Sequence, residues 1–490
     1  MKILLDLKPA LDGFAGIPQE SRLLFRGLLS LQGIEVTGLI QHGAAKLQSA
    51  LPLNFAELPA SERILRLSRA IISLEQTLHL GVRAQGWAKV RRYFEPHGLL
   101  WDTVCGRELQ TSCFDGTLFP DFIWRTFFSK TLDAVDKDVI TAARYRILME
   151  SRRTMTVAGL RSLRYFSRPR FARVQTSGIN AFIAQTPFPG RVSEGTQLII
   201  RYHDAVPLLM PHTIADKAFH QASHFYALQE NIRDGAWLCC ISEATRTDLL
   251  RVFPEAEPRT VVIPNMVAPD FYESVPAAAS LSRIIETRLA RVPEFRLPPF
   301  PGFTQEATPP YLLMVSTLEP RKNHALLVSA WERLRSTGYP ELKLVVVGSL
   351  GWMHDPILRR FQPWMERGDL WYLQNVPVRD LRVLYQNAVV TVCPSLAEGF
   401  DYSGVEAMAS GGVVAASDIS VHREVYGEAA LYFDPYNEAR TEEALRAVLQ
   451  PENETLRRQL RALVAGVADR YRPERVLPQW SEFLGAFLGK

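Results

Sequence analysis

Short apolar runs alternate with helical patterns along most of this chain of 490 residues. Runs rich in valine, isoleucine and leucine, bounded by polar or turn-forming residues, are typical of buried strands. They predict strands at 3–7, 36–40, 181–184, 197–202, 237–241 and 260–264, and then at 311–315, 343–347, 370–372, 389–393 and 413–416. Strands that alternate with helices form parallel sheets with right-handed crossovers, so the pattern predicts an α/β fold.

The chain is too long for a single hydrophobic core, and the pattern itself divides it in two. A helical stretch near 277–289 ends the first series, and a run with six prolines follows it. Proline at this density favours an extended connection without helix. We therefore predict an N-terminal Rossmann-like domain at 1–290, with an insertion at about 45–175. A proline-rich linker at 291–310 joins it to a C-terminal domain at 311–470, and a last aromatic-rich helix follows at 471–490.

The composition is that of a soluble globular enzyme, with 47% hydrophobic and 22% charged residues. The formal net charge of +4 argues against bulk binding of nucleic acid. No apolar run is long enough to span a membrane, and the apolar start is too short for a secretory signal, so we expect a cytoplasmic protein. The five cysteines have no C-x-x-C spacing and predict reduced, buried thiols rather than disulfides or a zinc site.

The stretch from Glu398 to Glu406, E-G-F-D-Y-S-G-V-E, is the most informative in the chain. It follows an apolar strand, and Glu406 falls on the expected first turn of a helix. Open α/β sheets bind ligands at the carboxyl ends of their strands. The N–H groups of a helix start can hold an anion such as phosphate, and carboxylates accept hydrogen bonds from hydroxyl groups. An isolated pair of glutamates is more often ordinary surface charge, so further motifs decide its meaning.

A second motif, V-S-T-L-E-P-R-K-N-H at 315–324, joins a predicted strand to a helix near 325–334. Arg321 can make a planar bidentate contact with phosphate, and Lys322 adds a compact positive charge. Helix starts normally favour acidic residues, so two basic residues here indicate an anionic ligand. The alternative is a solvated basic pair.

With A-M-A-S-G-G-V-V-A-A-S after Glu406, the two motifs resemble the donor site of family 4 retaining glycosyltransferases. The matches extend from residue 3 to about 434 but are poor between 45 and 175. The resemblance implies the GT-B fold, in which two Rossmann-like parallel-sheet domains face each other across a cleft. It also implies that the last helix crosses back to the first domain.

The resemblance implies roles for residues of both domains. In the second domain Glu398 is expected to bind the transferred sugar, Glu406 the ribose, and Arg321 with Lys322 the departing diphosphate. Further donor-binding residues implied in the same way are Thr317, Gly348, Gly399, Phe400, Asp401, Tyr402 and Ser403. In the first domain a Gly-rich loop at 12–20 supplies Gly13 and Gly16. His203 and Asp204, which end a predicted strand, are the other counterparts in that domain. His203 is expected to reach the transferred sugar, and Asp204 to orient its loop.

Two departures from the family pattern affect the site. Ser316 and Thr317 stand where many members carry Gly-Arg, so Arg321 has to supply that positive charge. Members commonly read E-G-F-G-L-P, whereas this chain has Asp401 in place of the second glycine. An aspartate beside a diphosphate is repelled unless its side chain turns toward a sugar hydroxyl or an acceptor. We hypothesise that Asp401 helps to select the sugar.

The motifs look most like those of mannosyl- and rhamnosyltransferases. They predict a retaining hexosyltransferase (EC 2.4.1.-), with GDP-mannose as the first choice among nucleotide diphosphate sugars. The expected acceptor is a surface polysaccharide such as an O-antigen, or a lipid-linked oligosaccharide. Two alternatives stay open, namely a sugar-nucleotide epimerase of the same fold and a non-catalytic protein that binds glycans or sugar nucleotides. No cofactor or metal is expected, and the D-x-D triplet at 136–138 is interpreted as surface charge on a helix.

The segment 151–191 holds eight arginines and no acidic residue, interleaved with Tyr165, Phe166 and Phe171. A basic surface with aromatic side chains is suited to anionic lipid, which would place the enzyme peripherally on the inner face of a membrane and suit an isoprenoid-linked acceptor. It is equally suited to an anionic glycan. A third interpretation is that acids elsewhere in the fold neutralise these arginines.

Overall fold

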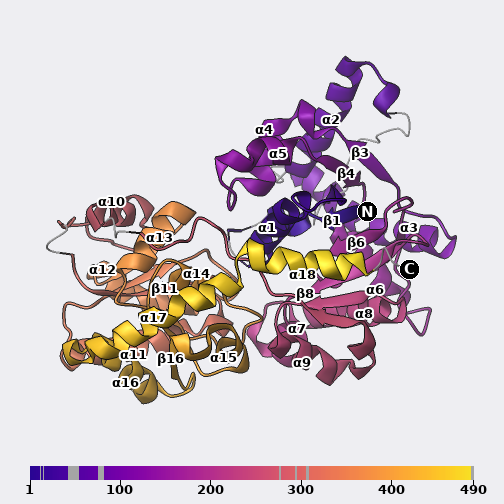
Figure 1. The fold of residues 1–490 in the computed structure, drawn as a ribbon. Helices are drawn as coiled ribbons and strands as arrows, with labels where there is room; N and C mark the ends of the chain where they lie inside the picture. The colour runs from indigo at the N-terminus through magenta and orange to yellow at the C-terminus, as the bar shows by residue number, and fades with distance from the viewer. Residues whose placement is uncertain are drawn as a thin grey trace.

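The computed structural model describes residues 1–490 except 12, 15, 42–54, 76–81, 275–277, 293–294, 305–307 and 487–490. Two α/β domains lie side by side, the N-terminal one on the right and the C-terminal one on the left of Figure 1. Each domain is built on its own sheet, and helices cover the sheet faces. The prediction of two parallel-sheet domains is confirmed.

The N-terminal sheet has eight strands in the order β10-β9-β8-β6-β1-β2-β4-β3, and only β3 runs antiparallel to its neighbour. Its central strands are buried along most of their length, which is why they read as continuous apolar runs in the sequence. The strands are β1 (Lys2–Asp6), β2 (Glu35–Ile40), β3 (Thr111–Phe114), β4 (Arg144–Leu148), β6 (Ala181–Ala184), β8 (Gln197–Tyr202), β9 (Trp237–Cys240) and β10 (Thr260–Val262). A separate pair joins β5 (Arg173–Val174) to β7 (Arg191–Val192).

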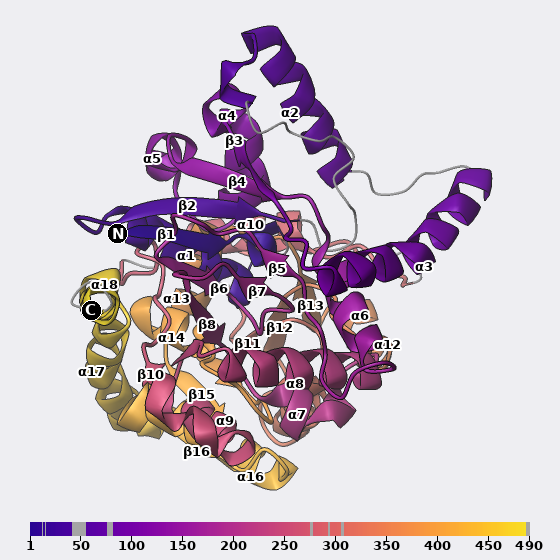
Figure 2. The same ribbon diagram turned by 90° about the vertical axis from the view of Figure 1, so that its right-hand side faces the viewer.

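The region expected as an insertion is part of this domain's framework, because β3 and β4 extend the sheet beside β2. Helices α2 and α3, from the same region, project from the body of the domain (Figure 2). Side-chain caps begin several helices. Ser151 accepts from the backbone N–H of Thr154 at the start of α6, and Ser242 accepts from that of Thr245 at the start of α9. The helices are α1 (Ile17–Leu29), α2 (Ala60–Glu75), α3 (Val82–Val104), α4 (Pro120–Ile123), α5 (Lys137–Thr141), α6 (Arg152–Ser162), α7 (Val206–Leu209), α8 (Lys217–Arg233) and α9 (Glu243–Val252).

The C-terminal sheet has six parallel strands in the order β13-β12-β11-β14-β15-β16. They are β11 (Tyr311–Val315), β12 (Lys343–Val347), β13 (Leu370–Leu373), β14 (Val390–Cys393), β15 (Val414–Ser417) and β16 (Ala430–Phe433). The helices between and after them are α11 (His324–Ser336), α12 (Asp355–Glu366), α13 (Val378–Asn387), α14 (Tyr402–Ala409), α15 (Ser420–Tyr426), α16 (Glu438–Leu449) and α17 (Glu454–Arg470). Right-handed βα units of this kind bring the turns after β11 and β14 to one edge of the sheet.

Two segments connect the domains. Helix α10 (Ala278–Arg288) packs against α13, and Leu289 pairs with Leu373 of β13, so the predicted boundary at 290 lies within a part that contacts the C-terminal sheet. In the described parts of the proline-rich stretch, Phe303 stacks on Trp371 and Phe300 meets the same ring edge-on. After α17 the last helix, α18 (Pro473–Gly485), lies on the N-terminal domain, where Trp480 contacts the buried guanidinium of Arg201.

The cysteine prediction is wrong in part. Cys239, Cys240 and Cys393 are buried and reduced, but Cys105 and Cys113 are exposed. Cys113 lies on β3, the outermost strand of its sheet, and Cys105 follows the end of α3. Among the described residues no helix combines the length and the apolar character that a membrane span requires.

Candidate functional site

The turn between β14 and α14 carries both glutamates of the first motif. Glu398 lies in the turn, and Glu406 lies on the buried side of α14 with 4% of its surface exposed. Asp401 ends the turn in the left-handed region (φ 61°) and caps α14 by accepting from the backbone N–H of Ser403. Burial of two carboxylates and a capping aspartate at one strand end is costly unless each has a partner, and each does.

Glu398 lies between the two basic residues of the second motif. Arg321 Nη1 donates to Glu398 Oε2 at 2.7 Å and to the carbonyl of Ala397 at 2.6 Å. Lys322 Nζ donates to Glu398 Oε1 at 2.5 Å. Burial acts to raise the pKa of Glu398, but the positive charges of Arg321 and Lys322 outweigh it and hold that pKa below its usual value. Glu398 is therefore ionised, and the three side chains form one charged cluster.

The two basic residues are held by a rigid turn. A single 3-10 turn, Pro320–Lys322, follows β11, and Asn323 (φ 59°) starts α11 in the left-handed region. Arg321 Nη2 donates to Glu319 Oε1 at 2.9 Å, and only 13% of the Arg321 side chain is exposed. Burial alone would lower the pKa of Arg321, but Glu398, Glu319 and Asp204 together raise it, so the guanidinium keeps its charge.

Asp204 belongs to the other domain, and its negative charge helps to raise the pKa of Arg321 across the interface. The same loop carries His203, whose carbonyl oxygen lies 1.8 Å from where a β-carbon on Gly399 would be. Only glycine fits at 399 for that reason. Ser242 Oγ also donates to the carbonyl of Gly399, at 2.8 Å. Both predicted loops, one from each domain, are thus in direct contact.

His203 itself is buried, and its Nε2 atom has no hydrogen-bond partner among the described residues. Burial, aided by the positive charge of Arg201, holds the pKa of His203 well below 6.5, so the ring is neutral at physiological pH. An unpartnered buried ring nitrogen is available to a ligand hydroxyl group. Asp204 accepts from the backbone N–H of Val206 at 3.0 Å, which orders the loop that carries His203.

Glu406 is bound from both domains. Gln19 Nε2, on α1, donates to its Oε1 atom at 2.8 Å, and the Tyr385 hydroxyl group, on α13, donates to its Oε2 atom at 3.0 Å. Burial raises the pKa of Glu406 to about 7, although these two hydrogen bonds oppose the rise. Glu406 is therefore partly protonated near neutral pH.

Asp401 is turned away from the diphosphate motif toward α15. Its Oδ2 atom lies 3.1 Å from His422 Nε2, and its Oδ1 atom accepts from the Ser403 hydroxyl group at 2.6 Å. His422 Nδ1 lies 2.9 Å from the carbonyl oxygen of Ser417. His422 and Asp401 thus face each other as a buried pair. Burial raises the pKa of Asp401, but His422 and then Lys322 lower it far more.

The Gly-rich loop leads into α1. Gly13 (φ 69°) and Gly16 (φ 71°) adopt backbone conformations that favour glycine. Glu20, on the first turns of α1, accepts from the hydroxyl group of Tyr402 at 3.0 Å, which is another hydrogen bond between the domains. Glu20 also forms a fully buried ion pair with Arg201 at 2.9 Å. The start of α1 therefore faces the donor turn and its helix.

Three of the predicted donor-binding residues have structural roles near the strand ends. An added β-carbon at Gly348 would lie 1.8 Å from the carbonyl oxygen of Ser316, so a glycine is required where the turns after β11 and β12 cross. The methyl group of Thr317 contacts the same crossing at Gly351. Phe400 is buried and packs edge-on against Tyr471, at the point where the chain returns to the N-terminal domain.

Several site residues were not found from the sequence. Glu319 and Gln19 lie inside the quoted motifs but carried no assigned role. Tyr385 and His422 carry no local signal, because each reaches the site only through the packing of α13 and α15 on α14. The residue of the D-x-D triplet nearest the core, Asp136, forms an ion pair with Arg26 of α1 at 2.5 Å. It is half-buried rather than purely surface charge.

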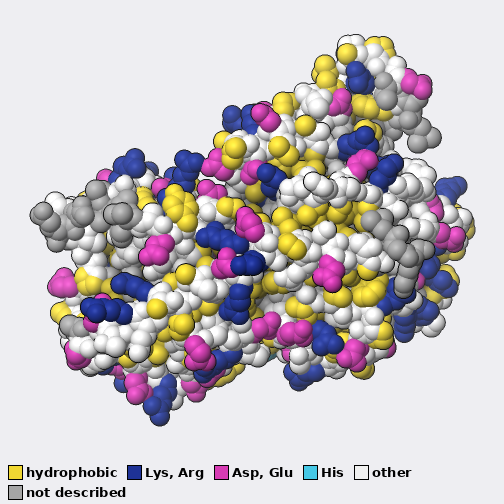
Figure 3. All heavy atoms as spheres, in the orientation of Figure 1, with side chains coloured by type: hydrophobic (Ala, Val, Ile, Leu, Met, Phe, Trp, Pro, Cys, Tyr) yellow, Lys and Arg dark blue, Asp and Glu magenta, His cyan; other side chains and the backbone are white. Residues whose placement is uncertain are grey.

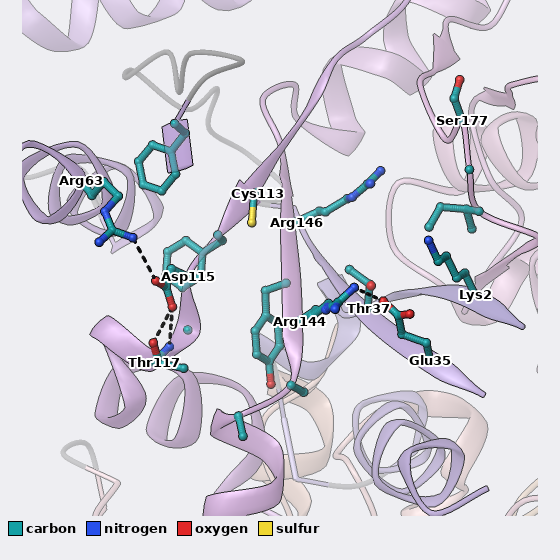
Figure 4. Close-up of a pocket in the computed structure, with 18 residues that line it drawn as sticks. Lys2, Glu35, Thr37, Arg63, Cys113, Asp115, Thr117, Arg144, Arg146 and Ser177 are labelled. Atoms are coloured by element: carbon teal, nitrogen blue, oxygen red, sulfur yellow. Dashed lines mark hydrogen bonds and ion pairs between the residues drawn. The ribbon is translucent and has the colours of Figure 1, made fainter. Parts of the chain in front are cut away.

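A pocket of about 540 Å³ lies at the opposite, amino-terminal edge of the N-terminal sheet (Figure 4). Its lining pairs Arg63 with Asp115 and Arg144 with Glu35. It shares no residue with the cluster around Glu398. Within the described ranges, no group of three or more His, Cys, Asp or Glu side chains is arranged to hold a metal ion.

Residues 301–462 match the family model described as Glycosyl transferases group 1. That range contains Glu398, Glu406, Arg321 and Lys322 with their surrounding motifs. The resemblance drawn from the sequence is therefore confirmed for the C-terminal domain.

Curated relatives cover parts of the chain. O-antigen chain mannosyltransferase B of Escherichia coli is 29% identical over 209 residues, which are 43% of this chain and 50% of that protein. Serotype-specific mannosyltransferase WbdA of Escherichia coli is 35% identical over 129 residues, which are 26% of this chain and 16% of WbdA. O-antigen chain mannosyltransferase RfbU of Salmonella typhimurium is 39% identical over 79 residues, which are 16% of this chain and 22% of that protein. The chain thus spans half or less of the length of these relatives.

Solved structures match the whole architecture. Sucrose-phosphate synthase from Thermosynechococcus elongatus superposes with a TM-score of 0.60 at 15% identity, over 100% of this chain and 99% of that one. Anabaena HepE in complex with UDP-glucose superposes with a TM-score of 0.51 at 15% identity, over 76% of this chain and 96% of that one. These are two-domain glycosyltransferases, so the GT-B fold is confirmed.

Proposed function

We propose that this chain, whose C-terminal domain matches group 1 glycosyltransferases, transfers a hexose from a nucleotide diphosphate sugar to a glycan acceptor with retention of configuration. The observation that carries the proposal is the cluster of Glu398, Arg321 and Lys322, buried at the point where the two sheet edges meet. Two fixed cations in a poorly hydrated site stabilise the charge that develops on a departing diphosphate.

Each residue then has a distinct task. Arg321 and Lys322 hold the diphosphate, and Glu398 orients the guanidinium and the ammonium group while accepting from a sugar hydroxyl. Neutral His203 presents its unpartnered Nε2 atom to the sugar from the opposite domain. Glu406 accepts from ribose hydroxyls and is held in place by Tyr385. The leaving phosphate oxygen takes the proton of the acceptor hydroxyl on the same face of the sugar, so no enzyme nucleophile is required.

We propose mannose as the sugar and GDP-mannose as the donor. The support is that the three relatives named above are two O-antigen chain mannosyltransferases and a serotype-specific mannosyltransferase. The same names support a surface polysaccharide as the acceptor. Asp401 is expected to influence sugar choice through the position of the turn, because its carboxylate is already paired with His422.

A thermal-shift screen of GDP, UDP, ADP and their sugars tests the donor class, because a ligand that binds only the folded protein raises its melting temperature. Incubation of the preferred sugar nucleotide with an oligosaccharide acceptor, followed by NMR of the product anomer, tests transfer and retention. An epimerised sugar formed without acceptor would favour the epimerase alternative. Binding without any turnover of the donor would favour a non-catalytic protein.

A further inference from the structure

The outer side of the N-terminal domain carries an apolar stripe that the proposed reaction does not use. Four large side chains of α3, Tyr93, Phe94, Trp101 and Val104, are between 51% and 68% exposed. Phe94 and Trp101 are seven positions apart, and Tyr93 and Val104 are eleven apart, so all four lie on one side of the helix. Single exposed apolar residues are common on soluble proteins, but a contiguous stripe marks an interaction site. The helix projects from the body of the domain (Figure 2), so the stripe is a ridge rather than a groove.

Arginines continue this stripe onto α6, which packs along α3. Arg161 Nη1 donates to the backbone carbonyl of Tyr93 at 2.9 Å, and the guanidinium lies 5.0 Å from the centre of the Tyr93 ring. Arg164 is exposed just beyond the end of α6, and the next residue, Tyr165, is 70% exposed. Aromatic and basic side chains therefore form one continuous surface.

The same surface runs into a pocket of about 770 Å³ at the ends of α3, α6 and α8. Arg168 and Arg233 both donate to a single carboxylate, that of Glu230. Arg170 is exposed and lies over the ring of Phe166, 5.2 Å from its centre. Figure 3 shows Lys and Arg side chains gathered at the right-hand edge of that view, beside α6 and α8.

The arginines of 151–191 are only partly neutralised. Arg152, Arg168, Arg173 and Arg191 form ion pairs with Asp6, Glu230, Glu108 and Asp234 respectively. Four of the eight arginines of this segment are therefore neutralised by acidic residues from elsewhere in the fold. Arg153, Arg164 and Arg170 are exposed, and the contacts described for Arg153 and Arg170 are with aromatic rings.

We propose that this surface docks the enzyme on a bilayer containing anionic phospholipid. We call it the α3–α6 surface, defined by Tyr93, Phe94, Trp101, Val104, Arg161, Arg164, Tyr165 and Arg170. The arginines contact lipid phosphates, and the aromatic stripe enters the interface between head groups and acyl chains. The projecting aromatic stripe of α3 can reach a flat bilayer, and the exposed arginines beside it complement an anionic membrane surface. The proposal does not depend on the proposed transfer reaction, since docking requires no donor.

Flotation of the full chain with vesicles of phosphatidylcholine, with and without phosphatidylglycerol, tests the charge component. The variant Arg164→Glu/Arg170→Glu is compared with Arg359→Glu/Arg461→Glu, which makes the same charge change at exposed positions of the C-terminal domain. Each arginine near an anionic surface contributes about fivefold to binding. We expect the first variant to lose at least ~25-fold in affinity for anionic vesicles, and the control to bind like wild type. An equal loss in both variants would show attraction by net charge alone and overturn the proposal.

A second pair tests the apolar component. Phe94→Ala/Trp101→Ala is expected to weaken binding to anionic vesicles about tenfold, while Tyr436→Ala, which removes an aromatic side chain 76% exposed on the C-terminal domain, leaves it unchanged. Far-UV circular dichroism checks that each variant is folded. Unchanged vesicle binding by the aromatic variant contradicts the proposal. So does wild-type protein that binds a soluble anionic polysaccharide but no vesicle, which would identify the surface as a glycan site.

Discussion

Gln19 Nε2 donates to Glu406 Oε1 at 2.8 Å, from the first helix of one domain to the donor helix of the other. The two residues are 387 positions apart in the sequence. A glutamate proposed to bind ribose is thus already bridged between the domains. Ribose hydroxyl groups that donate to Glu406 would compete with Gln19, so donor binding and the contact between the domains are linked.

Glu406 should make stability fall as the pH rises toward neutrality. Its pKa is about 7 in the folded protein and near 4.5 in the unfolded chain, so the folded state holds more protons between these values. The stabilising contribution of the neutral carboxyl is complete below about pH 4.5 and is lost as the pH passes 7. We expect Glu406→Gln to raise the free energy of unfolding at pH 8 by on the order of 2 kcal/mol and to leave it unchanged near pH 4.5.

Urea unfolding of wild type and Glu406→Gln across that pH range provides the measurement. Glu398→Gln serves as the comparison, because the pKa of Glu398 is lowered, not raised. That variant should lose stability at pH 8. A Glu406→Gln difference that does not depend on pH would contradict the assignment of a raised pKa. Donor turnover should fall in Glu406→Gln, since the amide replaces one hydrogen-bond-accepting oxygen of the carboxylate with an NH2 group that donates.

Asp401 is expected to act on the site by holding the donor turn. Asp401→Gly relieves the left-handed backbone but removes the carboxylate that faces the buried ring of His422. Loss of one partner of a buried pair costs about 3–5 kcal/mol, and glycine recovers about 1 kcal/mol at such a position. We therefore expect Asp401→Gly to lower the free energy of unfolding by about 2–4 kcal/mol.

A double-mutant cycle with His422→Gln separates the pair from the backbone effect. Much of the loss should disappear when His422 is already changed. If the effects of the two substitutions on the free energy of unfolding are additive, the Asp401–His422 contact does not stabilise the fold. The donor preference of Asp401→Gly tests the hypothesis of sugar selection, and a profile identical to wild type would reject it.

His203 is expected to contribute a hydrogen bond, not a charge. Its ring is buried and neutral, with Nε2 unpartnered. His203→Ala should lower kcat/KM about 10- to 100-fold, which corresponds to the loss of one hydrogen bond of about 1–3 kcal/mol. The pH dependence of kcat/KM should be the same in wild type and variant between pH 6 and 8. A step near pH 6.5 that vanishes in His203→Ala would show instead that the charged ring takes part.

Turnover is expected to be independent of divalent metal. Arg321 and Lys322 supply the positive charge on the diphosphate that a metal ion supplies in other transferases. Assay after dialysis against EDTA should give the rate of the untreated enzyme. Loss of activity in EDTA and its recovery with Mg²⁺ or Mn²⁺ would contradict this arrangement.

Most of the fold was accessible from the sequence, for a physical reason. Strands such as Ala181–Ala184 and Lys343–Val347 are buried on both faces of a parallel sheet, so they read as unbroken apolar runs. β4 reads R-Y-R-I-L, alternates polar and apolar residues near the edge of the sheet, and escaped notice. Helix α10 packs against α13 and β13 although it precedes the predicted boundary at 290, and such packing leaves no local mark in the sequence.

The site was accessible where its parts lie within one motif. Glu398 and the Arg321–Lys322 pair follow neighbouring strands, and parallel strands bring their carboxyl ends together. Gln19 and His422 could not be assigned, because their contacts depend on how the two domains and α15 are placed in space. Asp401 was expected to face the ligand, and only the structure shows the histidine that it faces.

Binding of a nucleoside diphosphate to matched lysine variants tests the central claim most directly. Lys322 pairs with Glu398 at the candidate site, and Lys343 pairs with Asp369 at the other end of the same sheet, both at 2.5 Å and similarly exposed. Titration calorimetry with the tightest ligand among GDP, UDP and ADP should show a Kd at least tenfold higher for Lys322→Ala than for wild type, with Lys343→Ala unchanged. An equal Kd in all three proteins, or no binding of any nucleoside diphosphate to wild type, would contradict the account.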